Sequence, residues 1–249
     1  MGHYKEIDLK AFLLAAGYGS RLGSISLAQP KPLVKAAGIP LICYPLAMLK
    51  AAGVDEIVCN LHYLGDQIVS FFEKNNNFGF KISFSFEDEI LGTGGGLKRC
   101  RDILANEGFF LINSDIITDL DLSSLIDVFH GASRLALFPS KHPTVSVKDG
   151  MVADFKNALE SGIAPSLDYM GAAFLLPEIF DFLEDSFSSV VYTGYTSLVS
   201  MGRLGFYEHG GFWIDAGTAA SLEEAENILN GEASFISRKV KKILGCNLY

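Results

Sequence analysis

Short apolar runs alternate with segments of helix length over the first half of the chain. Residues 11–16, 56–60 and 109–112 form such runs. We expect them to be strands, since a strand that is covered on both faces loses the alternation of apolar and polar positions. Residues 40–50 and 65–74 carry apolar positions at helical spacing between these runs. The pattern predicts an α/β fold, with a Rossmann-like open, mostly parallel mixed sheet and helices on both faces.

The same half contains further segments of both kinds. Residues 82–86 alternate apolar and polar side chains, and residues 135–138 form another apolar run, so both segments predict strands. Residues 97–104 and 122–129 are of helix length and predict helices that connect these strands.

The second half of the chain has a more β-rich pattern. Two short apolar segments, residues 144–147 and 151–152, flank Asp149 and Gly150. An Asp-Gly pair between such segments is typical of a two-residue β-hairpin turn. Residues 172–176 form another apolar run and predict a further strand.

These patterns divide the chain into a main domain and a closing helix. We expect one domain over residues 8–232, with a first part over about residues 8–139 and a small β-rich lobe over about residues 140–217. Residues 233–249 are expected to form a C-terminal amphipathic helix, and a membrane-binding helix is the less favoured alternative. The cations of this segment are Arg238, Lys239, Lys241 and Lys242.

Charge and composition exclude several classes of function. The 249 residues include 20 Lys and Arg against 29 Asp and Glu, which gives a net charge of −9 and argues against nucleic acid as a partner. The four cysteines form no C-x-x-C pair, so we expect free thiols rather than a zinc site. The chain has no apolar stretch of about twenty residues, as a membrane span needs. We expect a cytoplasmic protein with no membrane partner, present as a monomer or a dimer.

The strongest chemical signal follows the first predicted strand. Gly17 and Gly19 can adopt backbone conformations that let peptide N–H groups approach a phosphate closely. Arg21 adds a planar guanidinium suited to phosphate oxygens. Lys31 stands between two prolines, which hold it on a stiff segment. The loop does not match a dinucleotide fingerprint, because Leu22 occupies the position of its third glycine.

Two aspartates are candidate metal ligands. Asp115 follows the predicted strand at residues 109–112, and Asp215 follows another short apolar run. Mg²⁺ is commonly held by one or two carboxylates together with substrate phosphates. Each aspartate alone is more often a turn or cap residue, but together with the phosphate loop they favour a magnesium site. Thr218 is expected to cap the helix that follows Asp215.

Several motifs in series resemble those of the sugar-1-phosphate nucleotidylyltransferase family. The motifs are LLAAGYGSRL, PKPL, EILGTGGGLKR, NSD and WIDAGT, in this order, and the resemblance extends from about residue 11 to about residue 230. Within the family, the short length and the Thr-Gly-Gly-Gly run are most similar to the uridylyltransferases that act on N-acetylmuramate 1-phosphate. The family's R-x-x-P-x-T motif is altered here, since Ser24 replaces its proline.

The resemblance implies specific roles for residues of these motifs. Arg21 and Lys31 are implied to be catalytic, on the leaving pyrophosphate and on the α-phosphate respectively. Asp115 and Asp215 are implied to hold Mg²⁺. Glu87 stands where many relatives have a glutamine that reads the base. The residues implied at the nucleotide are Leu14, Ala15, Ala16, Gly17, Gly19, Glu87, Gly92 and Thr93, and those implied at the sugar are Asn113, Lys156 and Gly171.

The resemblance also implies a reaction. The expected activity is the Mg²⁺-dependent transfer of a nucleotidyl group from a nucleoside triphosphate, with UTP preferred, to a sugar 1-phosphate, with release of pyrophosphate. Three alternatives remain open from the sequence. They are a cytidylyltransferase for a phospho-alcohol, a guanylyltransferase for mannose 1-phosphate, and a non-catalytic relative that senses nucleotides or sugars.

Overall fold

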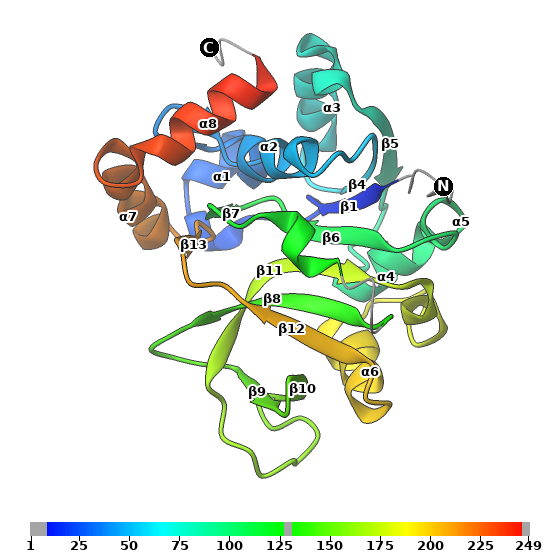
Figure 1. Ribbon diagram of the computed structural model, residues 1–249. Helices are drawn as coiled ribbons and strands as arrows, with labels where there is room; N and C mark the ends of the chain where they lie inside the picture. Colours follow the sequence, from blue (N-terminus) through cyan, green and yellow to red (C-terminus); the bar gives the residue numbers. More distant parts are fainter. Residues whose placement is uncertain (1–8, 127–130, 246–249) are drawn as a thin grey trace, which may run out of the picture.

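The computed structural model describes residues 9–126 and 131–245. Within these residues the chain forms a nine-stranded mixed sheet with helices on both faces (Figure 1). In spatial order the strands are β5 (Lys81–Phe86), β4 (Glu56–Leu61), β1 (Lys10–Leu14), β6 (Phe109–Asn113), β11 (Leu167–Leu175), β8 (Ser133–Pro139), β12 (Leu204–Glu208), β10 (Met151–Phe155) and β9 (Val145–Lys148).

The first four strands in this order are parallel, as the apolar runs predicted. β4, β1 and β6 pair in register, so that Asn60, Leu14 and Asn113 lie side by side at their carboxyl ends. The parallel arrangement is less extensive than expected, because β11 lies antiparallel to both β6 and β8. The only other parallel pairing in the described part of the sheet joins β12 to β8.

Helices cover both faces of the sheet and form an apolar core on each face. The side chains of β1 alternate between these two cores. Ala11 and Leu13 pack on one face and Phe12 on the other, all fully buried. The helices over the first face are α2 (Cys43–Ala51), α3 (Gly65–Lys74), α7 (Ala219–Asn230) and α8 (Ser234–Leu244). Those over the second face are α4 (Gly92–Arg99), α5 (Arg101–Leu104) and α6 (Thr196–Ser200).

Short helical turns and two small strand pairs complete the described chain. The short turns are η1 (Ser20–Leu22), α1 (Ile25–Ala28), η2 (Lys31–Leu33), η3 (Asn76–Gly79), η4 (Leu122–Leu125), η5 (Pro177–Asp181) and η6 (Val191–Tyr195). The small pairs are β2 (Lys35–Ala36) with β3 (Ile39–Pro40), and β7 (Ile116–Thr118) with β13 (Trp213–Asp215).

Three helix predictions differ from the structure. The helix expected over residues 40–50 begins at Cys43, because Pro40 pairs as part of the short strand β3. The helix expected over residues 97–104 begins at Gly92 and is interrupted at Cys100, which separates α4 from α5. Of the helix expected over residues 122–129, the structure shows only the 3₁₀ turn η4, and residues 127–130 lie outside the described residues.

The second half of the chain extends the first sheet. β9 and β10 form the expected hairpin, with Asp149 and Gly150 both at positive φ in its turn. β11 and β12 insert beside strands of the first half, so the part expected as a lobe shares one continuous sheet with it (Figure 1).

The closing helix α8 spans Ser234–Leu244, within the expected range of residues 233–249, of which residues 246–249 lie outside the described residues. Its apolar side chains Ile236, Val240 and Leu244 are buried in the core that α2 also lines. Arg238 and Lys241 are exposed on its outer face. Among the described residues, no helix is long and apolar enough to cross a membrane.

Candidate active site

A cavity of about 220 Å³ lies beyond the carboxyl ends of the parallel strands. The register brings Leu14, Asn60 and Asn113 to its floor from three neighbouring strands. Ligands of open α/β sheets bind at this edge, because loops that diverge from adjacent strand ends leave a crevice there.

Most of the residues predicted from the sequence line this cavity. They are Leu14, Ala15, Ala16, Gly17, Arg21, Lys31, Glu87, Gly92, Thr93, Asn113, Asp115 and Asp215. Three predicted residues do not line it, namely Gly19, Gly171 and Lys156. Pro32, Asn60, Ile90 and Ser114 line the cavity but were not assigned a role from the sequence.

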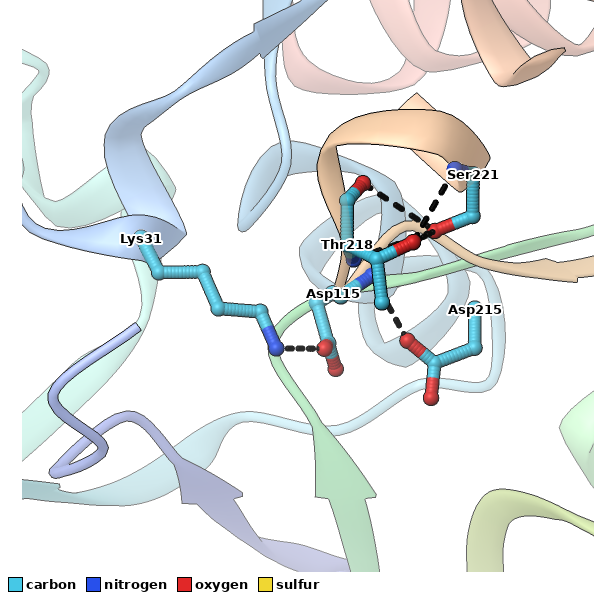
Figure 2. A network of polar contacts seen from close by, with 6 residues as sticks. Lys31, Asp115, Asp215, Thr218 and Ser221 are labelled. Atoms are coloured by element: carbon cyan, nitrogen blue, oxygen red, sulfur yellow. Dashed lines mark hydrogen bonds and ion pairs between the residues drawn. The ribbon is translucent and has the colours of Figure 1, made fainter. Parts of the chain in front are cut away.

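The pairing of β7 with β13 brings the two aspartates together. Asp215 lies opposite Ile116, and the peptide N–H of Ala216 donates to the carbonyl oxygen of Asp115 at 3.0 Å. Asp115 forms an ion pair with Lys31 (Figure 2). Two carboxylates and one lysine ammonium therefore meet at one end of the cavity.

The far end of the β7–β13 pair is closed by Asp119. Its Oδ1 accepts hydrogen bonds from Phe212 N at 2.7 Å and from His209 Nε2 at 2.8 Å. The hydroxyl of Thr118 donates to the carbonyl oxygen of Phe212 at 2.6 Å. These contacts hold the short strand pair in register and so fix where its two aspartates emerge.

Asp215 is held by its own chain. Its Oδ1 accepts from the N–H of Gly217 at 2.7 Å, whereas α7 is capped by a reciprocal Thr218–Ser221 pair, as expected for Thr218 (Figure 2). Burial raises the pKa of the Asp215 carboxyl above its ordinary value, and the charge of Asp115 adds to this against the lowering effect of Lys31. Asp215 is thus available to the cavity rather than used as a helix cap.

Gly19 acts on the site through Lys31. Gly19 has φ +66°, and a Cβ there would lie 2.9 Å from the Cβ of Lys31. Because only glycine fits both the conformation and the space, the loop packs directly on the stem of Lys31. Gly19 thereby helps to aim the ammonium at the carboxylates from outside the cavity lining.

A buried hydrogen-bonded chain closes the other end of the cavity. Asn60 Oδ1 accepts from the N–H of Ala15 at 2.9 Å, and Asn60 Nδ2 donates to Glu87 Oε1 at 2.8 Å. Glu87 Oε2 accepts from the N–H of Leu91 at 2.8 Å. Glu87, only 4% exposed, therefore joins three loops. In the sequence, Asn60 is only a polar residue at the end of an apolar run, so no role was predicted for it.

His62 links two loops that flank this chain. Its Nδ1 donates to the carbonyl oxygen of Glu87 at 2.7 Å, and its Nε2 lies 3.0 Å from the hydroxyl of Tyr18. The rings of Tyr18 and His62 meet edge to face at 5.1 Å between centroids. No motif in the sequence indicated this contact.

The glycines at the start of α4 admit another part of the backbone. A Cβ at Gly95 would lie 2.1 Å from the carbonyl oxygen of Ser186, and one at Gly92 would lie 2.4 Å from that of Ser188. The Thr93 hydroxyl accepts from the N–H of Val190 at 2.9 Å. The segment at residues 186–190 is therefore docked on α4.

Gly171 and Lys156, both expected at the sugar, have different surroundings. Gly171 has φ +81° and lies against the Asn113 side chain, where a Cβ would come within 2.7 Å of Asn113 Nδ2. Lys156 is exposed after β10, at φ +48°. The structure thus brings Gly171 to the edge of the site and does not bring Lys156 into the cavity lining.

The chain matches known proteins over most of its length. The family model described as "Nucleotidyl transferase" matches residues 10–146. The N-acetylmuramate alpha-1-phosphate uridylyltransferase of Neisseria meningitidis is 32% identical over 88% of this chain and 97% of its own length. The chain belongs to the nucleotidyl transferase family. This confirms the family expected from the motifs.

The chain is also similar to a longer guanyltransferase in sequence and to a CTP transferase in fold. The mannose-1-phosphate guanyltransferase of Candida albicans is 30% identical over 94% of this chain, but the chain spans only 66% of that relative's length. The solved structure of the inositol-1-phosphate CTP transferase of T. maritima superposes with a TM-score of 0.76 at 19% identity, covering 93% of this chain and 96% of that one, which shows a shared fold.

The carboxylates of this nucleotidyl transferase fit a divalent metal that a substrate helps to hold. Asp115 and Asp215 offer hard oxygen donors of the kind that Mg²⁺ prefers. Over the part of the chain that the structure describes, no cluster of three or more His, Cys, Asp or Glu side chains is positioned to hold a metal. The donor set therefore suits an ion that is completed by phosphate oxygens and water.

Proposed function

We propose that this protein transfers a nucleotidyl group from a nucleoside triphosphate, with UTP preferred, to a sugar 1-phosphate and releases pyrophosphate. The observation that carries this proposal is the charged end of the cavity. Arg21, Lys31, Asp115 and Asp215 line it together, although they come from four separate segments of the chain. Such a group can hold phosphates and a divalent ion at the same time.

The proposed step is an in-line displacement at the α-phosphorus. An oxygen of the sugar phosphate forms a bond to that phosphorus, while the bond from the phosphorus to the bridging oxygen of the β-phosphate breaks. The electron pair leaves with pyrophosphate. The attacking oxygen is already anionic, so the step needs no general base. Catalysis then consists of positioning and charge stabilisation.

The two cations have different proposed tasks. Lys31, held by its flanking prolines and by Gly19, would meet the α-phosphate, where charge grows during attack. Arg21 lines the cavity with a guanidinium that can grip two oxygens of the leaving pyrophosphate. Asp115 and Asp215 would hold Mg²⁺, which supplies charge neutralisation to the phosphates when it is bound.

The preference for UTP rests on similarity to the uridylyltransferase, which this chain covers almost from end to end. Both carboxylate oxygens of Glu87 already accept hydrogen bonds, from Asn60 and from Leu91. In this proposal Glu87 therefore holds the surrounding backbone and does not repel a carbonyl group of the base. Peptide groups at the start of α4, at Gly92 and Thr93, are then left to read the base.

The similarity to guanyltransferases favours GTP with mannose 1-phosphate as the second candidate, since that match extends over 94% of the chain. A non-catalytic sensor is less well supported, because such a protein has no need to keep all four charged residues at one end of the cavity. We further propose that the protein acts in the cytoplasm.

The decisive experiment is a pyrophosphate-release screen. N-acetylmuramate, glucose, mannose and other sugar 1-phosphates are each paired with UTP, GTP, CTP, ATP or dTTP in the presence of Mg²⁺. We expect a product of the mass of a UDP-sugar. Faster turnover with GTP than with UTP for every sugar would reject the UTP preference, and no turnover with any pair would reject the reaction.

A further inference from the structure

The ammonium of Lys31 lies beside the two carboxylates at the charged end of the cavity. It pairs with Asp115, and the two side chains are only 15% and 7% exposed. Its Nζ also lies 3.1 Å from the position that a Cβ on Gly217 would take, and Asp215 Oδ1 lies 2.5 Å from the same position. Lys31 therefore stands close to both aspartates.

This arrangement answers an electrostatic problem. Two carboxylates that share a partly buried site repel one another, and a buried charge without a partner is costly. Lys31 supplies a countercharge through its ion pair with Asp115. A divalent ion beside Asp115 would need the same oxygen lone pairs and would meet the positive charge of Lys31 within a few ångströms.

We infer that Lys31 is a resting counter-ion that keeps the metal site of the free protein weak until a nucleotide binds. This inference rests on the proposed function, because it requires a triphosphate as the incoming ligand. Phosphate oxygens offer Lys31 a second anionic partner, and its transfer to them leaves Asp115 to the metal. Metal and nucleotide then strengthen each other's binding by the same factor, as linkage requires.

The position of Lys31 suits such an exchange. The backbone around it is stiff, since Pro30 and Pro32 flank it and Gly19 packs on its stem. The flexible part of the side chain ends within the cavity, so the ammonium can change partner without a backbone movement. Arg21 also lies close to Asp215, since its Nη2 is 2.9 Å from the position that a Cβ on Gly217 would take. Among the described residues, however, the ion pair at these carboxylates is the one between Lys31 and Asp115.

The test measures Mn²⁺ binding to the whole protein without nucleotide, from the loss of the free-ion signal in electron paramagnetic resonance. Lys31→Met should bind Mn²⁺ about tenfold more tightly than the wild type, within the roughly 5–150-fold range of typical coupled sites. Lys31→Arg, which keeps the charge, should bind as weakly as the wild type. Lys31→Gln repeats the test if the methionine variant fails to fold, as judged from its thermal midpoint.

Two controls separate pairing from general charge. Lys35→Met removes the same charge from an exposed position nearby on the chain and should leave Mn²⁺ affinity unchanged. Arg21→Met removes a cation that lines the cavity and should tighten binding clearly less than Lys31→Met. Equal Mn²⁺ affinity in the wild type and both neutral Lys31 variants would overturn the inference.

The outcome is independent of the proposed reaction. If the wild type forms a nucleotide sugar but the neutral Lys31 variants do not gain Mn²⁺ affinity, the counter-ion role is wrong and the reaction stands. If those variants gain affinity but no sugar phosphate is turned over, the counter-ion role stands and the reaction is wrong.

Discussion

Lys31 and Arg21 line the same cavity, but their environments predict different kinetic effects. In the proposed reaction Lys31 meets the α-phosphate, where charge accumulates during attack, so its contact should strengthen in the transition state. Lys31→Met should lower kcat and kcat/KM together by about 10²–10³-fold, as expected for the loss of one preorganised donor. Steady-state kinetics at saturating metal would measure this loss, with Lys35→Met as the matched control. A raised KM at unchanged kcat would reduce Lys31 to a binding residue.

Arg21 should instead act on binding as well as on rate. Arg21→Ala should raise the KM for the nucleotide, because the guanidinium would grip phosphates in both the ground state and the transition state. Arg21→Lys should rescue poorly, since an ammonium cannot reproduce a two-pronged contact. An unchanged KM in Arg21→Ala would argue that the guanidinium does not touch the nucleotide.

Asp154 is a buried carboxylate that holds the backbone after β10. It is fully buried within β10, and its carboxylate accepts from the N–H groups of Phe155, Leu159 and Ser161 at 2.7, 3.0 and 3.0 Å. Burial alone would raise its pKa, but these hydrogen bonds outweigh burial and lower the pKa below its ordinary value. These hydrogen bonds fix the backbone of the loop that contains Lys156, and this lysine is exposed at the surface.

The lowered pKa of Asp154 has a defined effect on stability. Its contribution is complete above the ordinary pKa of an aspartate, about 3.9, and is lost as the pH falls from there through the lower folded-state value. Asp154→Asn presents an amide N–H₂ to backbone donors and should cost about 1–3 kcal/mol at neutral pH. The difference should shrink in acid, as urea titrations from pH 7 to pH 3 would show. Asp149→Asn, in the exposed turn of the same hairpin, is the control, and a pH-independent difference would contradict the prediction.

The connection from β13 to α7 contains two polar residues with different proposed roles, Asp215 as a metal ligand and Thr218 as a helix cap. Asp215 accepts from Gly217 N, whereas Thr218 accepts from the N–H of Ser221 and begins α7. Thr218→Ala should cost about 0.5–2 kcal/mol of stability and leave kcat nearly unchanged, because only the cap is lost. Thr218→Ser keeps the capping hydroxyl and should have the stability of the wild type.

Asp215→Asn should show the opposite pattern to Thr218→Ala. An asparagine oxygen can still accept from Gly217 and no longer repels Asp115, so the thermal midpoint should stay near that of the wild type. Turnover should fall strongly, since a neutral amide is a poorer ligand for a divalent ion. Thermal melts and kinetics on the same preparations check both variants. Near-normal turnover of Asp215→Asn at saturating Mg²⁺ would remove Asp215 from the metal site.

Besides sharing one sheet, the two halves of the chain contact each other at α4, where residues 186–190 pack on its glycines. A methyl group at Gly95 would overlap the carbonyl oxygen of Ser186, at 2.1 Å. Gly95→Ala should therefore destabilise the protein by about 1–3 kcal/mol through overpacking, even though alanine favours a helix over glycine by about 1 kcal/mol. The free energy of unfolding from urea denaturation measures the effect. Gly210→Ala is the control, because no atom lies within 4 Å of its added Cβ, and equal stability of the two variants would contradict the prediction.

Features that depend on neighbouring residues could be predicted from the amino-acid sequence. The apolar runs located the core strands, and the 3.6-residue period located α3 with its observed ends and the position of α8. The Asp-Gly turn and the Thr218 cap followed from local backbone preferences. The chemical types in the motifs likewise identified Arg21 and Lys31, which do line the cavity. In each case the deciding interactions lie within a few positions along the chain.

The contacts between residues that are distant along the chain could not be predicted in this way. The β7–β13 pairing joins Asp115 to Asp215, and the register of parallel strands brings Asn60 close enough to bond Glu87. The antiparallel insertion of β11 beside β6 and the docking of residues 186–190 on the α4 glycines left no local signal either. Strand order and register are set by the packing of the whole core, because a strand's own residues fix its faces but not its neighbour.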